Sequence, residues 1–271
     1  MDTIKELVAA GRPGEALAQA QQQVRAKPED AKLRVLLFQL LVVTGQWQRA
    51  STQLEVCGEL DAEALPMVNT YREALKCELV REAVFDGKTT PMLFGQPAEW
   101  VALLVQALQQ QAEGNAGAAR SLREQALAQA ETVAGALDGT PFEWVCDADS
   151  RLGPVLEAVV NGRYAWVPFS ALSKVQIEAP GDLRDLVWLP AHLWFPNGGE
   201  TVALIPTRYP RSTNWDDERV WMARRTEWTP LDPPNVEQYA GVGQRVFATD
   251  AGEHSLLDVR CIELGQSGAK A

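Results

Sequence analysis

The sequence has few histidines, and its four cysteines lie far apart. Only two histidines, His192 and His254, occur among its 271 residues, and its cysteines form no C-x-x-C pair. A zinc site and a disulfide framework therefore both lack sequence support. We expect reduced and mostly buried thiols, as in a cytoplasmic protein. The four thiols are Cys57, Cys77, Cys146 and Cys261.

Basic charge and long apolar runs are also scarce. The formal net charge is -11, whereas a protein that binds nucleic acid or an anionic membrane needs a basic face. The apolar stretch 36–43 is interrupted by Gln39 and is too short to span a bilayer. The first residues, with Asp2, Lys5 and Glu6, do not match a secretory signal. We expect a cytoplasmic protein without nucleic-acid or membrane partners.

The short motifs of common catalytic and nucleotide sites are missing as well. None of G-x-G-x-x-G, G-x-x-x-x-G-K-[ST], H-E-x-x-H or G-x-S-x-G occurs. Cys146 and His192 are conceivable as a nucleophile and its base, but nothing in the sequence brings them together. A buried thiol beside Trp144 is the favoured interpretation. We predict no enzyme, no catalytic residue and no cofactor.

The composition changes along the chain. Residues 1 to about 135 are rich in Ala, Leu, Gln and Glu and hold only Trp47 and Trp100 of the nine tryptophans, which is typical of helices. From Pro141 onward the other seven tryptophans appear with Pro, Gly and short Val/Ile/Leu runs, which indicate strands and turns. We predict a helical domain over 1–137 and an α+β domain over 141–271.

A 34-residue spacing recurs in the helical half. Gly45 and Ala50 follow Gly11 and Ala16 by that interval (45 − 11, 50 − 16), which is the tetratricopeptide period. Gly114 and Ala119 suggest a third copy. The resemblance to tetratricopeptide repeats is partial, because Arg34 stands where an aromatic residue is usual and Phe38 where a small one is usual, so an unrelated helical bundle is the alternative. Expected helices span 3–10, 13–26, 28–45, 46–57, 66–85, 97–113 and 116–137.

The second half predicts a small, mostly antiparallel α+β domain. Ser150 and Pro154 are typical of a helix start, and the apolar residues 152–160 then predict a short helix ended by Asn161-Gly162. Strands are expected at 164–169, 175–178, 186–195 and 201–205, the last two joined by the Asn197-Gly198-Gly199 turn. A final strand pair is expected at 245–249 and 256–262.

Asp147-Ala148-Asp149 is the one constellation that resembles a catalytic motif, because D-x-D holds a divalent cation in some transferases. No glycine-rich nucleotide site accompanies it. A carboxylate pair next to Arg151 is more simply explained by capping and an ion pair, so we predict no metal site.

Two further surface features allow two interpretations. The basic clusters 208–211 and 224–225 are either solvated surface, which is commoner, or contacts for an acidic partner. The tryptophans of the second half belong either to the sheet core, which we favour, or to an interface.

Three long strings carry a family resemblance. FEWVCDADSRLGPVLEAVVNGRYAWVPF, DLRDLVWLPAHLWFPNGGETVALIPTRYP and GQRVFATDAGEHSLLDVRCIEL follow one another between 142 and 264 and resemble the core of the ImpE/TagJ family (SciE-type). The resemblance implies a non-catalytic accessory protein of a bacterial type VI secretion system. It further implies association with the small, TssB-type subunit of the contractile sheath, alongside the ATPase that recycles the sheath.

A partner helix laid in a groove of the helical domain is the expected mode of binding. By the tetratricopeptide resemblance, the inward face of the helix after Pro28 presents Lys32, Val35, Gln39 and Val42. Two alternatives stay open: a metal-dependent enzyme that uses Asp147 and Asp149, and a helical-repeat adaptor of another pathway.

Overall fold

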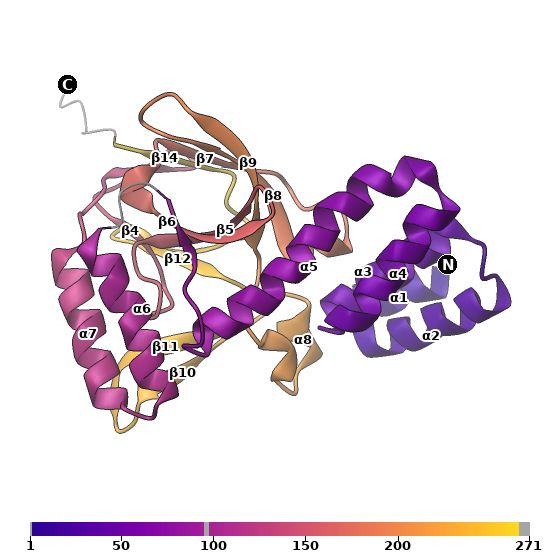
Figure 1. Ribbon diagram of the computed structural model, residues 1–271, viewed down its shortest axis with the longest axis horizontal. Coiled ribbons are helices and arrows are strands. Elements are labelled where there is room, and N and C mark those ends of the chain that lie inside the picture. The colour runs from indigo at the N-terminus through magenta and orange to yellow at the C-terminus, as the bar shows by residue number, and fades with distance from the viewer. Residues whose placement is uncertain (1, 95–97, 266–271) are drawn as a thin grey trace.

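The computed structural model describes residues 2–94 and 98–265 and consists of a helical array joined to a sheet-rich part. Figure 1 shows the first four helices at one end, the sheets at the other, and the long helix α5 running from one to the other. The tetratricopeptide-like array followed by a mostly antiparallel α+β part confirms the predicted fold class.

Seven α-helices lie in the first half of the part of the chain that the structure describes, with the short strand Met92–Leu93 between the fifth and the sixth. Gly11 and Gly45 end α1 and α3 with φ of 76° and 71°, which favour glycine, and the Asp30 carboxylate caps α3 by accepting from the Leu33 N–H at 3.1 Å. Position 97, the expected start of α6, lies outside the described residues. The helices are α1 (Asp2–Ala9), α2 (Pro13–Ala26), α3 (Ala31–Val43), α4 (Trp47–Leu60), α5 (Leu65–Phe85), α6 (Glu99–Ala112) and α7 (Ala116–Gln129), with the 3-10 turn η1 (Ala62–Ala64).

The main sheet has nine strands in the order β1-β6-β5-β9-β8-β7-β14-β2-β3, all antiparallel pairs except β1 with β6. Its strands are β1 (Met92–Leu93), β2 (Gly135–Leu137), β3 (Thr140–Phe142), β5 (Val155–Val160), β6 (Arg163–Pro168), β7 (Lys174–Ile177), β8 (Trp188–Trp194), β9 (Glu200–Pro206) and β14 (Cys261–Leu264). The 3-10 turns η2 (Phe169–Ala171) and η3 (Leu183–Leu186) lie between them.

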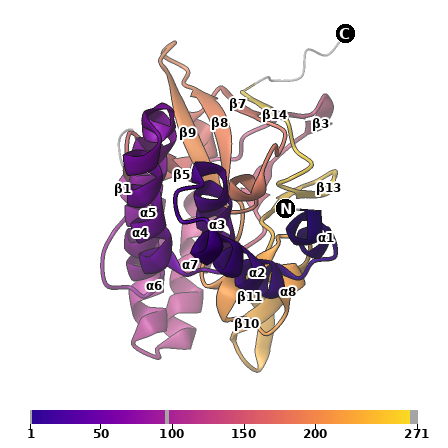
Figure 2. The same ribbon diagram turned by 90° about the vertical axis from the view of Figure 1, so that its right-hand side faces the viewer.

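Two smaller sheets complete the fold. The order β13-β12-β4 joins β13 (Gly252–Ser255), β12 (Val246–Thr249) and β4 (Val145–Asp147), and a hairpin joins β10 (Thr226–Asp232) to β11 (Asn235–Gly243). Between β9 and β10 lie η4 (Ser212–Asn214) and the short helix α8 (Glu218–Trp221). In both views α8 and the hairpin lie below the main sheet (Figures 1 and 2).

The helix expected after Ser150 is wrong, since Val155–Val160 form strand β5. All six residues are buried, because the strand lies inside the protein on both faces. Burial on both faces explains why five of the six residues are apolar. Asn161 and Gly162, with φ of 50° and 72°, form the hairpin turn to β6 rather than a helix end.

Two other predicted elements differ in the structure, and one hairpin was not predicted. The last helix of the array ends at Gln129 instead of 137, because 135–137 pair as β2 with both β14 and β3. Strand β12 pairs through the Ala251-Gly252 turn with 252–255, not with 256–262. The β10–β11 hairpin was not expected.

The helical array and the sheets share their hydrophobic cores. Trp188 of β8 and Met222 after α8 are buried in the core of helices α1–α5. In a second core, Trp100 of α6 packs with Val155 of β5 and Trp166 of β6. A third core, which includes Phe169 and Phe247, lies within the sheets. No helix among the described residues is long and apolar enough to cross a membrane.

The predicted division at 137–141 is tested by expressing residues 1–137 and 141–271 separately. The shared cores favour one continuous unit, because the first piece loses Trp188, Val155 and Trp166 from its packing. We expect neither piece to show a cooperative thermal transition by circular dichroism, whereas the whole chain does. A cooperative transition of 1–137 alone would establish two independent domains.

Contact between the array and η4 is tested by Gly45→Ala. A Cβ there would lie 2.3 Å from Thr213 Oγ1, whereas at Gly114, which also has positive φ, it would meet nothing within 4 Å. We expect Gly114→Ala to lose about 1 kcal/mol from backbone strain and Gly45→Ala to lose about 2–4 kcal/mol because of the added clash. Urea unfolding measures both, and equal losses would contradict this packing.

Candidate functional site

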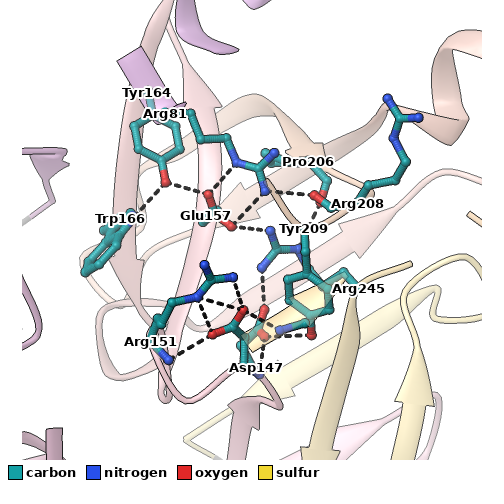
Figure 3. A network of polar contacts seen from close by, with 12 residues as sticks. Arg81, Asp147, Arg151, Glu157, Tyr164, Trp166, Pro206, Arg208, Tyr209 and Arg245 are labelled. Carbon is teal, nitrogen blue, oxygen red and sulfur yellow. Dashed lines mark hydrogen bonds and ion pairs between the residues drawn. The ribbon is translucent and has the colours of Figure 1, made fainter. Parts of the chain in front are cut away.

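A network of charged side chains lies buried where α5 meets the sheets, and Glu157 of β5 is at its centre (Figure 3). Arg81 of α5 donates to both carboxylate oxygens of Glu157, at 2.7 Å from Nε and 3.1 Å from Nη2. Tyr164 of β6 donates its hydroxyl to the same carboxylate at 2.5 Å and accepts from Trp166 Nε1 at 2.8 Å. Glu157 is fully buried.

Arg245 continues the network from Glu157 to Asp147 at the end of β4. Its two terminal nitrogens form ion pairs with the two carboxylates, and its Nε donates to the Pro206 carbonyl at 2.9 Å. Asp147 Oδ1 also accepts from the Tyr209 hydroxyl at 2.9 Å. Both Arg245 and Asp147 are buried.

The predicted ion pair of the D-x-D segment is confirmed. Arg151 Nε lies 2.9 Å from Asp149 Oδ1, and the same oxygen accepts from the Arg151 backbone N–H at 2.9 Å. Asp149 Oδ2 accepts from the Gly241 N–H at 2.9 Å, and Asp147 Oδ1 accepts from the Asp149 N–H at 2.8 Å. Both carboxylates thus hold the loop between β4 and β5 against neighbouring strands.

The charges of the residues joined in these contacts balance, whereas Arg123, which is also fully buried and interacts with Asp149, is an additional positive charge. Its arginines are Arg81, Arg151, Arg208 and Arg245, and its carboxylates are Glu78, Asp147, Asp149 and Glu157. Four of each sign offset the loss of hydration that isolated buried charges would suffer.

The two carboxylates that share Arg245 differ in pKa. The pKa of Glu157 falls to about 2, because Arg81, Arg245 and the Tyr164 hydroxyl together outweigh the desolvation of the charged form. The pKa of Asp147 rises to about 6, because desolvation by burial outweighs its one arginine and the neighbouring Asp149 opposes ionisation.

Arg208 connects the sheet part to the helical array. Its guanidinium donates to the carbonyls of Val43 at 2.7 Å and Val42 at 3.3 Å, at the C-terminal end of α3, and to the Trp221 carbonyl at the end of α8. Carbonyls at a helix end carry partial negative charge and bind cations. Burial lowers the pKa of Arg208 to about 10.

Part of the expectation of solvated basic clusters is therefore wrong. Arg208 is 4% exposed because its carbonyl partners replace water. Arg211 stays exposed and pairs with Asp86, and Arg224 donates to the Ala9 carbonyl at 3.0 Å at the end of α1.

The crevice beside the network is too small for a substrate. The crevice beside Arg81 and Arg208 measures about 20 Å³, which is enough for one water molecule. Cys146 and His192 lie on strands of different sheets, and burial raises the pKa of the Cys146 thiol to about 12, so it is protonated at neutral pH. Within residues 2–94 and 98–265, no three His, Cys, Asp or Glu side chains gather as metal ligands.

The predicted partner-binding residues lie on α3 but differ in exposure. Lys32 is exposed, Val35 and Gln39 are half-buried, and Val42 is fully buried. Because one is buried and two are half-buried, the four do not form a continuous exposed surface, and the turn η3 also packs against α3. Val42 does not contact a partner in this conformation, and the role of the other three remains a prediction.

Residues of the sheet part pack against helices α4 and α5 of the array. The Trp188 ring lies 5.8 Å from Tyr71 of α5 and 5.9 Å from Trp47 of α4, and its Nε1 donates to Glu78 at 2.8 Å. The Arg184 guanidinium lies 4.8 Å from the Tyr71 ring centre. The segment 184–188 thus packs against α4 and α5, and partner binding at the predicted residues of α3 stays a prediction.

The tryptophans divide between core and surface. Trp166 and Trp188 are fully buried, which confirms the core interpretation for them, whereas Trp215 is 41% exposed and Trp144 is 37% exposed.

Sequence reasoning did not identify Arg81, Glu157 and Arg245 as partners. The one available signal was a glutamate in the apolar run of β5.

Removal of the Glu157 charge tests the importance of the network. Glu157→Gln leaves Arg81 and Arg245 buried without their shared anion, so we expect a loss of about 3–5 kcal/mol in the free energy of unfolding at neutral pH. Glu73→Gln, which removes an exposed pair with Lys76, is the control and should lose less than about 1 kcal/mol. Urea unfolding measures both.

The same pair of proteins gives a pH test. The pKa of Glu157 in the folded protein lies near 2, below its usual value of 4.5. The contribution of its charge to the free energy of unfolding is therefore complete above pH 4.5 and is lost as the pH falls toward 2. The difference in stability between the wild type and Glu157→Gln should therefore shrink over that range. A difference independent of pH there would contradict the assigned charge.

Comparisons with known proteins agree with this architecture. A family model described as ImpE protein matches residues 139–263, and a tetratricopeptide repeat model matches residues 7–68. The chain is 53% identical over 265 residues to the "Type VI secretion system accessory component TagJ" of Pseudomonas aeruginosa, covering 98% of this chain and 92% of that protein.

The fold is similar to the crystal structure of protein VPA1032 from Vibrio parahaemolyticus. The TM-score is 0.89 at 23% sequence identity, over 98% of this chain and 99% of the other. The matched core and the nearly full-length similarity to TagJ confirm the resemblance drawn from residues 142–264, and the chain belongs to the ImpE family.

Proposed function

We propose that this protein is a non-catalytic accessory component of a bacterial type VI secretion system. The observation that carries the proposal is the 53% identity to TagJ over 98% of the chain. Similarity that extends through both the array and the sheets supports a shared role of the whole molecule rather than a borrowed domain.

The partner in this proposal is the small, TssB-type sheath subunit, bound through one of its helices. Helical repeats bind extended or helical segments on surfaces formed by successive helices, and α2–α4 lie in the segment that matches the repeat model. The protein acts in the cytoplasm, alongside the ATPase that recycles the sheath. The net charge of -11 is consistent with a protein partner rather than nucleic acid or an anionic membrane.

The contacts of Asp147 and Asp149 argue against the enzyme alternative. Arg245 and Arg151 neutralise the two carboxylates, and backbone N–H groups occupy further oxygen positions. A metal ion would have to displace these buried partners, so a structural role accounts for the segment better than a metal site.

Calorimetric titration of the small sheath subunit into the purified chain tests the proposal. At about 100 μM protein, a complex of micromolar affinity gives a measurable heat and a defined stoichiometry. A peptide of the subunit's terminal helix should reproduce the binding. Absence of binding by both the subunit and its peptide would exclude this partner.

A further inference from the structure

A groove of about 480 Å³ lies between the start of α4 and the middle of α5, on a part of the array that the sheets leave open. Its apolar lining consists of Trp47, Leu75 and Leu79. Leu79 is 57% exposed although it lies in the middle of a 21-residue helix, and the adjacent Val80 is 42% exposed. An exposed leucine that lines a groove together with a half-buried tryptophan is typical of a contact surface.

The charged lining of this α4–α5 groove is entirely basic. Arg49, Arg72 and Lys76 line it, and no carboxylate does. Arg49 and Arg72 donate to the amide oxygens of Gln46 and Asn69, and Lys76 forms an exposed pair with Glu73 at 2.8 Å. The chain as a whole has 36 acidic and 25 basic residues, so this concentration of positive charge differs from the average surface.

The N-terminus of α4 adds to the positive potential. The 14-residue helix begins at Trp47, has no acidic residue in its first turn, and its N-cap residue Gln46 makes no side-chain capping bond. The free N–H groups of a first turn attract anions. Gln46 and Gln48 line the same groove as the three basic side chains, so the N-terminus of α4 lies beside them.

Three other grooves of similar size lack this combination, and the one of about 540 Å³ beside Leu172 is lined by Glu131 and by no basic residue. The groove of about 530 Å³ between α5 and the sheet is lined by Glu73 and Glu178 as well as Arg184. The groove of about 540 Å³ beside Phe195 is lined by Glu200 and by no basic residue. Charge therefore distinguishes the α4–α5 groove.

We propose that the α4–α5 groove binds an acidic amphipathic helix of a protein partner. Apolar residues of that helix at i, i+3, i+4 and i+7 pack on Trp47, Leu75 and Leu79, and its flanking carboxylates pair with the three basic side chains. The partner identity rests on the proposed function, whereas the groove and the chemistry of its ligand do not. Binding here requires no displacement of η3 from the inward face.

The first experiment reverses the charge of the groove in the full chain. R49E/R72E/K76E is compared with K5E/R25E/K27E, which changes three exposed basic residues of the first two helices and their flank and alters the net charge equally. Fluorescence anisotropy measures binding of the small sheath subunit, and thermal melts by circular dichroism check folding. We expect at least about 10-fold weaker binding for the groove variant and less than about 2-fold for the control.

An uncharged substitution tests the apolar contact. Leu79→Ala changes a mostly exposed side chain and should leave the fold intact, yet we expect about 10-fold weaker binding. Val202→Ala, at the 71% exposed residue of the neighbouring groove, is the control and should bind as the wild type does. Unchanged affinity in Leu79→Ala and in the groove reversal would overturn the assignment.

A designed probe separates the groove from the identity of the partner. The probe is an amphipathic peptide of about 18 residues with leucine on one face and glutamate elsewhere. In the control peptide each glutamate is replaced by lysine. We expect the acidic peptide to bind the wild type and not R49E/R72E/K76E, with an affinity that falls as salt rises, and the basic peptide not to bind.

The outcomes distinguish the two proposals. If the acidic peptide binds the groove but the sheath subunit does not bind the chain, the groove stands and the proposed partner is wrong. If the sheath subunit binds the wild type and the groove variant equally, or if Lys32→Glu alone abolishes binding, the proposed function stands and the groove is wrong. Failure of the acidic peptide to bind the wild type also overturns the groove.

Discussion

The carboxylate of Glu157 is the contact on which the rest of the structure depends. It receives Arg81 from the helical array, Arg245 from the segment before β12 and Tyr164 from the adjacent strand. These groups are buried, so each of them needs the others to compensate for lost hydration. A single anion thereby determines where α5 lies relative to two different sheets.

Around this contact, the array and the sheets complete each other. Arg208 neutralises the end of α3, Trp188 fills the core of α1–α5, and the turn η3 lies along the inward face. The sheet part therefore covers some of the surface that the array would expose on its own.

Local signals predicted the helices well, whereas contacts between distant residues did not emerge from the sequence. Glycines at 11 and 45 end helices by their own backbone preference, and Asp149 pairs with Arg151 two residues away, so both were predictable. Glu157 and Arg81 are separated by 76 positions, and no local pattern relates them. Val155–Val160 were assigned to a helix because Ser150 and Pro154 are local start signals, while burial on both faces is a tertiary property.

The attachment of α5 also limits how this array can change in length. Repeat arrays ordinarily gain or lose units freely, since each unit contacts only its neighbours. Here a unit inserted between α5 and the sheets would move Arg81 away from Glu157, and one inserted between α3 and α5 would separate the C-terminal carbonyls of α3 from Arg208. Duplication of a repeat, the usual route by which such proteins acquire longer binding surfaces, is therefore closed to this molecule unless the new unit is added ahead of α1.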